Sequence, residues 1–334
     1  MLKPLAALLL CATAQAADYK LLHSIPVPGD GFWDYVLADA GSRKLFVSHG
    51  THVQVIDMDS EKIVGDIPDT PGVHGIAVDE REGKGFITAG RAGRVDVFDL
   101  NTLAKTGSIP AGANPDAITY DPDSNRILAF NGGSKDATVI DPHEGKAEGL
   151  IPLGGKPEAG VPDGHGHVFV NIEDKAEIAE LDPRTLKVVH RFKVGGCQEP
   201  SGLAMDQKNH RLYAGCDNKV MAVVDSRSGK TLADVPIGDG VDACDFDPAT
   251  GFAFASTGDG HLTIIKETSA GKFEVVQTVT TQSSARTMSL DKKSHRSYLP
   301  AAKEGAPPAA TAKNPHPRPS MVAGSFSILV VGTE

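Results

Sequence analysis

A unit of about forty residues recurs seven times along the chain, and this repeat limits the possible folds more than any other feature. Each copy begins with a short apolar stretch that ends in Asp. The seven stretches are DYVLAD, HGIAVD, DAITYD, EAGVPD, SGLAMD, DACDFD and RTMSLD, and they begin at Asp34, His74, Asp116, Glu158, Ser201, Asp242 and Arg286. A period of this length is typical of propeller blades rather than of helical solenoids.

Three more strand-like segments follow in each copy. A second segment such as KLFVSH or RILAFN is followed by a third such as VQVIDM or ATVIDP, and then by a fourth such as KIVGDIP or TLADVPIG. Turn residues separate the segments, and no segment has a sustained helical period. Each copy is therefore predicted to form a four-stranded antiparallel blade, which makes the fold class all-β.

The two ends of the chain are predicted to meet in the seventh blade. The last copy lacks a fourth strand, because the chain stops after FSILVVGTE, which matches a third strand. The missing pattern occurs before the first copy, in YKLLHSIPV at residues 19–27. Completing the last blade with this N-terminal strand removes an exposed sheet edge. The sequence thus predicts one seven-bladed β-propeller over residues 17–334.

The first sixteen residues, MLKPLAALLLCATAQA, have the layout of a secretory signal peptide. A lysine precedes a short apolar run, and the small residues around Gln15 suit cleavage before Ala17. The run is too short to span a membrane, and no later segment approaches the necessary length. We therefore expect residues 1–16 to be a signal peptide and the mature protein to be periplasmic or secreted.

The last copy contains an Ala/Pro-rich insert at residues 301–325, between its second and third strands. This composition predicts a poorly packed, partly extended loop on the same face as the start of the first strands. Lys303, Lys313 and Arg318 make the insert locally basic. Two interpretations stay open, a lid or partner-docking arm and a loop without fixed structure.

The charge of the chain disfavours nucleic acid as a partner. Residues 1–16 contain one of the 33 basic residues and none of the 43 acidic residues, so the mature chain has a net charge of about −11. A nucleic-acid backbone requires a basic face. We expect instead a monomer that engages a small molecule or a protein partner.

Three cysteines remain after removal of the signal peptide. In an oxidising compartment they allow at most one disulfide and leave one free thiol. Cys197 lies just before the first strand of the fifth copy, and Cys216 ends the second strand of the same copy. A Cys197–Cys216 disulfide is the predicted pairing, and Cys244 is expected to be a small buried residue.

The repeat KLFVSHGTHVQVIDMDSEKIVGDIP and its copies resemble the YVTN-type repeat of exported seven-bladed propellers, the YncE-like proteins. The resemblance covers nearly all of the mature chain and implies the same fold and export. Propellers of related shape include metal-dependent lactonases, redox enzyme subunits and non-catalytic binding platforms. The resemblance alone therefore does not select a function.

The seven residues that begin the first strands are the main candidates for function, and we call them the ring residues. In a propeller the first strand of each blade lines the central channel, so these residues should form a ring at one mouth. Asp34, Asp116, Glu158 and Asp242 supply carboxylates, His74 an imidazole and Arg286 a guanidinium. Such a ring suits a divalent cation, Ca²⁺ or Zn²⁺. Alternatively, the ring residues only bind water in a polar channel.

The second strands run antiparallel to the first, so their last residues should lie near the same mouth. His49 and Asn131 occupy such strand ends, Asn171 lies one step from another, and all three extend the list of candidate ligands. The most specific expectation is that Asp34, His49 and His74 lie together at one corner of the channel mouth.

Two functions remain open from the sequence. The first is a non-enzymatic binding or scaffold protein that engages a small ligand or a protein at the acidic mouth, since no catalytic constellation is complete and no G-x-S-x-G motif occurs. The second is a divalent-metal-dependent hydrolase of the lactonase type, in which the cation would act as a Lewis acid and a ring carboxylate as the base.

Overall fold

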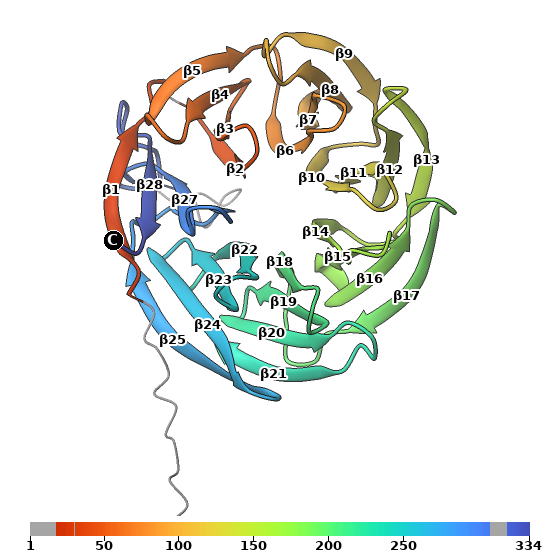
Figure 1. Cartoon of the computed structure of the whole chain (residues 1–334), viewed down its shortest axis with the longest axis vertical. Helices are drawn as coiled ribbons and strands as arrows, with labels where there is room; N and C mark the ends of the chain where they lie inside the picture. The colour runs from red at the N-terminus through yellow and green to blue at the C-terminus, as the bar shows by residue number, and fades with distance from the viewer. Residues whose placement is uncertain (1–17, 30, 308–318) are drawn as a thin grey trace, which may run out of the picture.

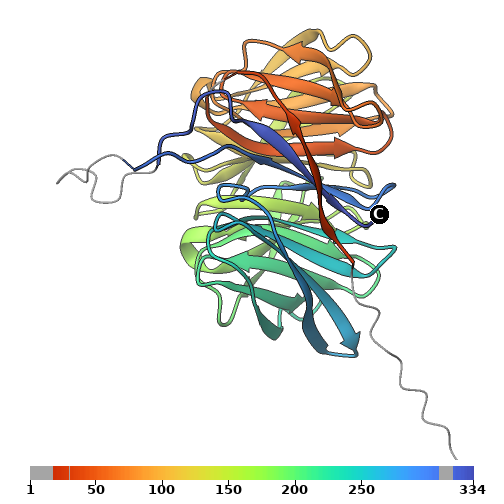
Figure 2. The same cartoon turned by 90° about the vertical axis from the view of Figure 1, so that its left-hand side faces the viewer.

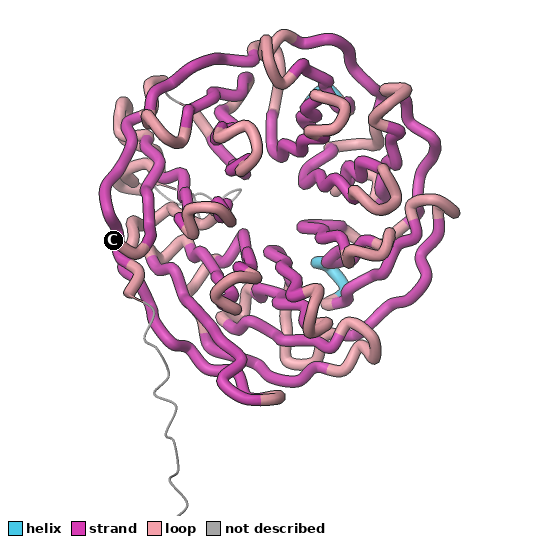
Figure 3. The backbone as a smooth tube through the Cα atoms, in the orientation of Figure 1, coloured by secondary structure: helices cyan, strands magenta, loops and turns pink. Residues whose placement is uncertain are grey.

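The computed structural model describes residues 18–29, 31–307 and 319–334 and contains seven four-stranded antiparallel sheets arranged in a ring (Figure 1). The predicted all-β, seven-bladed propeller is therefore confirmed. Within the described ranges, helix is confined to the short 3-10 turns η1 (Gly90–Ala92) and η2 (Glu173–Lys175), and Figure 3 shows how strands dominate the backbone. The predicted signal peptide lies outside the described residues.

Each blade contributes one strand to each of four concentric layers (Figure 1). The innermost strands are β2 (Trp33–Asp39), β6 (Val73–Asp79), β10 (Pro115–Asp121), β14 (Pro157–Pro162), β18 (Pro200–Asp206), β22 (Val241–Asp247) and β26 (Ser289–Asp291). The second strands are β3 (Lys44–His49), β7 (Lys84–Ala89), β11 (Arg126–Asn131), β15 (Val168–Ile172), β19 (Arg211–Cys216), β23 (Phe252–Thr257) and β27 (Arg296–Ala301).

The outer two layers complete the blades. The third strands are β4 (His52–Asp57), β8 (Arg94–Asp99), β12 (Asp136–Asp141), β16 (Glu177–Asp182), β20 (Val220–Asp225), β24 (His261–Ser269) and β28 (Ser327–Gly332). The outermost strands are β5 (Lys62–Ile67), β9 (Lys105–Pro110), β13 (Lys146–Pro152), β17 (Lys187–Lys193), β21 (Thr231–Pro236), β25 (Lys272–Thr280) and β1 (Lys20–Pro26).

The N-terminal strand closes the ring, as predicted. β1 pairs antiparallel with β28, in a register that runs from Lys20 opposite Gly332 to Pro26 opposite Ser327. The seventh blade therefore combines the first strand of the fold with its last three, and Figure 2 shows the red and blue strands side by side. This pairing covers the edge that β28 would otherwise expose.

The hydrophobic core lies between neighbouring blades. Phe46 of the first blade and Phe98 of the second are both fully buried, and their ring centroids lie 5.5 Å apart. Phe86 of the second blade, Phe130 of the third and Phe254 of the sixth are also fully buried. Because each apolar cluster uses side chains from two adjacent blades, the blades depend on one another for burial.

The Asp at or just after the end of each innermost strand has an architectural role. Asp79 accepts a hydrogen bond from the backbone N–H of Arg81, and Asp121 accepts hydrogen bonds from the N–H groups of Asp123 and Ser124. These short loops turn the chain into the second strand. They lie at the opposite end of the channel from the ring residues.

The insert begins where β27 ends and returns to β28. Glu304 and Met321 form an isolated antiparallel bridge, so the described arms of the insert lie against each other. Figure 2 shows these arms extending beyond one face of the ring. Residues 308–318, which include Lys313 and Arg318, lie outside the described part. No helix among the described residues is long and apolar enough to cross a bilayer.

Candidate ligand site at the channel mouth

A β-bulge at the start of the innermost strand places the ring residue. In the first blade Trp33 pairs with His49 and Val36 pairs with Val47, so two residues, Asp34 and Tyr35, lie opposite one. The same slip occurs in five more blades. A bulge redirects side chains and is common beside binding sites. Repetition of this bulge around the axis explains how successive strands each present a ring residue at the mouth.

Three of the predicted ring residues come together from three adjacent blades. His74 Nδ1 lies 2.6 Å from Asp34 Oδ2 and 3.6 Å from Asp116 Oδ1. The imidazole therefore sits between two carboxylates that the sequence separates by 82 positions. Asp34 is buried, while His74 and Asp116 are half-buried.

Arg286 extends this contact to the sixth blade. Its Nε donates a hydrogen bond to Asp242 Oδ2 at 2.6 Å, and its Nη2 donates to Asp34 Oδ1 at 3.3 Å. On the far side of Asp242, the hydroxyl of Ser201 donates to Oδ1 at 2.8 Å. Six ring residues thus form one continuous polar chain around the mouth, in the order Ser201, Asp242, Arg286, Asp34, His74 and Asp116.

The seventh ring residue, Glu158, has a partner that the repeat did not reveal. Lys156, two positions earlier in the loop leading to the strand, places its ammonium 2.6 Å from Glu158 Oε1 and also contacts Glu173. The lysine contributes a cation to the mouth although it is not a ring residue. The only indication of Lys156 in the sequence is that it immediately precedes the innermost strand of the fourth blade.

Burial has a large effect on the carboxyl groups of the ring. It raises the pKa of Glu158 to about 8, with a further contribution from the negative charge of Asp116 and opposition from Lys156. Burial also raises the pKa of Asp116 to about 6, while His74 opposes that shift. The pKa of Asp242 is raised by burial as well, against the influence of Arg286. Taking carboxylates out of water without full pairing favours their protonated forms.

The pKa values of the cationic groups at the mouth are also raised, but here burial opposes the shift and the neighbouring carboxylates cause it. Burial alone would lower the pKa of His74, but its hydrogen bond to Asp34 and the charge of Asp116 outweigh burial, so the pKa is raised. Arg286 behaves in the same way beside Asp242 and Asp34. The mouth therefore holds excess negative charge that its own cations only partly compensate.

Tyr35 forms the floor of the mouth, and sequence reasoning missed this residue. In each of the other six blades, the residue that follows the ring residue is small. These residues are Gly75, Ala117, Ala159, Gly202, Ala243 and Thr287. One aromatic ring can therefore occupy the space that six small residues leave, and it packs on the cluster containing Ala117 across the channel. Burial, followed by the charges of Asp242 and Glu158, raises its pKa well above the usual value, so the phenol stays neutral.

His49 does not join the ring, contrary to the expected corner. Its ring lies 4.6 Å from that of Phe326, and its Nδ1 lies 3.0 Å from Gln54 Oε1. A Cβ on Gly29 would approach the imidazole to 3.0 Å, so the N-terminal segment covers this histidine. His49 pairs with Trp33 before the bulge and is buried against Phe326, which follows the insert.

Asn131 and Asn171 are buried within the blade ends. The Asn131 amide donates to Asp136 and Thr138 at 2.7 and 2.9 Å. The Asn171 amide donates to the carbonyls of Ser201 and Gly202, both at 3.0 Å, and so ties the fourth blade to the fifth. The structure thus gives both side chains bonds within and between blades and does not place them in the Asp34–His74–Asp116 cluster.

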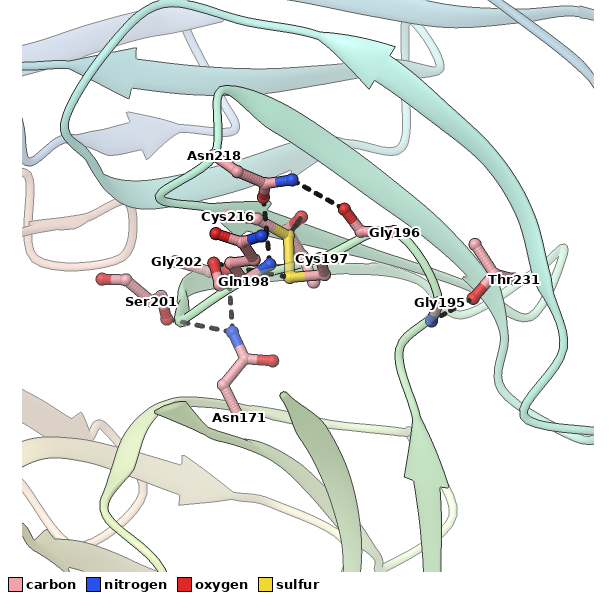
Figure 4. Close-up of a disulfide and its surroundings, with 11 residues drawn as sticks. Asn171, Gly195, Gly196, Cys197, Gln198, Ser201, Gly202, Cys216, Asn218 and Thr231 are labelled. Carbon is pink, nitrogen blue, oxygen red and sulfur yellow. Dashed lines mark hydrogen bonds between the residues drawn. A yellow bond between two sulfur atoms is a disulfide. The ribbon is translucent and has the colours of Figure 1, made fainter. Parts of the chain in front are cut away.

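The predicted cysteine pair is joined in the structure. Cys197 and Cys216 form a disulfide with a Cα–Cα distance of 5.4 Å, which fastens the loop entering β18 to the end of β19 (Figure 4). Asn218 reinforces the same loop by donating to Gly196 O and accepting from Gln198 N. Cys244 is a free thiol on the channel wall, and burial raises its pKa to about 12.

The mouth has the donor atoms for a divalent cation. Asp34, His74 and Asp116 each offer one ligand atom, and these three atoms lie within 4.8 Å of one another. One imidazole nitrogen with two carboxylate oxygens suits Zn²⁺ or Mn²⁺ better than an all-oxygen Ca²⁺ site. A bound cation would also stabilise the ionised forms of carboxyls whose pKa values burial raises.

Among solved structures, the chain is similar to a chain of the Kuenenia stuttgartiensis hydrazine synthase, with a TM-score of 0.71 and 15% sequence identity. The alignment covers 82% of this chain and 94% of that chain. No protein-family model and no curated protein matches the sequence. At this identity the similarity concerns the fold alone, and it agrees with the seven-bladed β-propeller described above.

Proposed function

We propose that this chain is an exported, non-catalytic binding propeller that holds a divalent cation at its channel mouth. The observation that carries the proposal is the meeting of Asp34, His74 and Asp116 from three separate blades, with their ligand atoms within 4.8 Å. The resemblance of the repeat to YncE-like exported propellers agrees with a binding role. So does the absence of a nucleophile–base–orienter constellation among the described ring residues.

Protonation of the mouth gives the proposal a pH dependence. A cation must compete with protons for the Asp116 carboxyl, whose pKa is about 6, and for the His74 imidazole, whose pKa is raised. Metal binding therefore releases protons and weakens as the pH falls. We expect tighter binding at pH 7.5 than at pH 5.

Thermal melting with added metal tests the proposal. Zn²⁺ or Mn²⁺ should raise the melting temperature of the mature protein, and EDTA should reverse the rise. His74→Ala and Asp116→Asn should abolish the rise, whereas His143→Ala, at an exposed histidine, should retain it. A melting temperature that ignores both metals, or that responds equally in His74→Ala, contradicts the proposal.

The proposed export has support from two parts of the chain. Residues 1–16 have the layout of a signal peptide, and a disulfide between Cys197 and Cys216 favours an oxidising compartment. Fractionation of cells that produce the full chain should find it outside the cytoplasm with its N-terminus at Ala17. Retention of an uncleaved chain in the cytoplasm would argue against export.

A metal-dependent hydrolase of the lactonase type remains the second candidate, and one observation favours it. The pKa of Glu158 is about 8, so this carboxyl lies in the range of a general acid or base at neutral pH. Hydrolysis of dihydrocoumarin that requires added Zn²⁺ and is lost in Glu158→Gln, with zinc binding retained, would establish this activity. If the zinc-loaded protein does not hydrolyse dihydrocoumarin, the hydrolase candidate fails and the binding role remains.

A further inference from the structure

A cavity opens at the end of the channel opposite the ring residues. Its volume is about 470 Å³, within the range of small-molecule sites. It lies at the carboxyl ends of the innermost strands, whereas the ring residues lie at their starts. Apolar side chains supply about half of the wall, including Leu37, Val161, Leu203, Met205, Phe246 and Pro248.

This opposite cavity continues into the middle of the propeller. A second space of about 160 Å³ lies inside the channel, lined by Tyr35, Ile76, Ile118 and Met288. The two spaces share Leu37, Gly160, Leu203 and Cys244 in their walls. Together they form a partly apolar shaft that runs from the opposite mouth to the underside of Tyr35, where Asp242 also lines its wall.

The rim of the shaft carries two carboxylates and two ammonium groups, and these differ in how far protein partners already engage them. Its two carboxylates already accept protein donors. Asp206 accepts from the backbone and side-chain amides of Asn209, and Asp245 accepts from the N–H groups of Phe246 and Leu290.

The two rim lysines are less engaged. The Lys292 ammonium lies 4.0 Å from Asp245, at the limit of an ion pair, and its side chain is 58% exposed. Lys208 is exposed and has no ion-pair or hydrogen-bond partner within the described ranges. Two available ammonium groups therefore face the opening of this shaft.

We propose that the opposite mouth binds an amphipathic anion, with its apolar body in the shaft and its anionic head at Lys208 and Lys292. Insertion replaces water along apolar walls, which is favourable, and leaves the charged head at the solvated rim. The Tyr35 ring limits how far the apolar body can enter. This site does not depend on the proposed cation site, because its lining contains neither His74 nor Asp116.

Calorimetric titration with decanoate, below its micellar concentration, tests the site. We expect one decanoate per chain, clearly weaker binding of decanol, and no binding of decylammonium. The double variant Lys208→Glu/Lys292→Glu should weaken decanoate binding at least about tenfold, since it turns two attractions into repulsions. Lys146→Glu, at an exposed lysine of β13, is the matched control and should bind as the parent protein does.

The free thiol reports the depth of insertion independently of the lysines. Cys244 lines both spaces, so bound decanoate should slow its alkylation by N-ethylmaleimide, and decylammonium should not. His74→Ala should keep both decanoate binding and this protection, which separates the site from the cation site. Absence of decanoate binding, equal binding of decylammonium, unchanged affinity in the double lysine variant, or unprotected Cys244 would each overturn the proposal.

Discussion

At the residue scale, the ring combines groups whose charges do not balance. Asp34 contacts both His74 and Arg286 directly, but Glu158 and Asp116 keep raised pKa values. Protein stability should therefore depend on pH through these carboxyls. The folded chain holds protons that the unfolded chain releases.

Glu158→Gln should remove one part of this dependence. The pKa of Glu158 is raised from 4.5 to about 8, so its contribution to stability is full below pH 4.5 and is lost as the pH rises toward 8. Relative to the parent protein, Glu158→Gln should gain at least about 1 kcal/mol between pH 5 and pH 8. Urea unfolding at both pH values measures this gain.

Glu144→Gln serves as the control, because that carboxylate is 59% exposed and the variant should follow the parent curve. An equal response of Glu158→Gln and Glu144→Gln would mean that Glu158 ionises without penalty in the folded protein.

The sequence predicted which residues lie near the starts of the innermost strands, but it did not predict how their side chains pair. The position of Tyr35 in the channel depends on six small residues in other blades, and that complementarity is visible only when the blades are superimposed. His49 was misplaced because a bulge shifts the register by one residue, which redirects the neighbouring side chains. Lys156 reaches Glu158 from a loop that carries no repeat signature.

At the scale of elements, the fifth blade depends on a covalent link that the other blades lack within the described residues. The disulfide closes a loop with a sequence separation of 19 between Cys197 and Cys216. Both residues are buried, and the loop between them includes the whole of β18. The link therefore restricts the unfolded chain locally, next to the channel.

The double variant Cys197→Ser/Cys216→Ser should lose about 3 kcal/mol of unfolding free energy, as expected for a loop of this length. Urea unfolding of the oxidised parent and the variant measures the loss. Dithiothreitol should destabilise the parent but not the variant, and Cys244→Ala should keep the parent's sensitivity to dithiothreitol. An unchanged midpoint in the double variant would mean that the link adds no stability.

At the scale of the whole molecule, the ring is closed by a single strand from the opposite end of the chain. The repeat period and the missing fourth strand were sufficient to predict seven blades and this closure, because both depend on pattern rather than on side-chain geometry. β1 pairs with β28 over its whole length, with one irregularity near His23. Without β1, the backbone of β28 would form a free edge.

Removing β1 should open the propeller. A chain that begins at Pro28 should melt at a clearly lower temperature than one that begins at Ala17, and it should aggregate through the exposed edge of β28. Calorimetry and light scattering measure the two effects. A chain without β1 that remains monomeric and equally stable would show that the seventh blade does not need its fourth strand.

Equilibrium dialysis against Zn²⁺, followed by metal analysis, tests the central claim most directly. At pH 7.5 the mature parent protein and His143→Ala should each retain one zinc ion per chain more than His74→Ala does. This difference should disappear at pH 5, where Asp116 and His74 are protonated. Equal zinc content in the parent protein and His74→Ala at pH 7.5 would contradict a cation site assembled by three blades at the channel mouth.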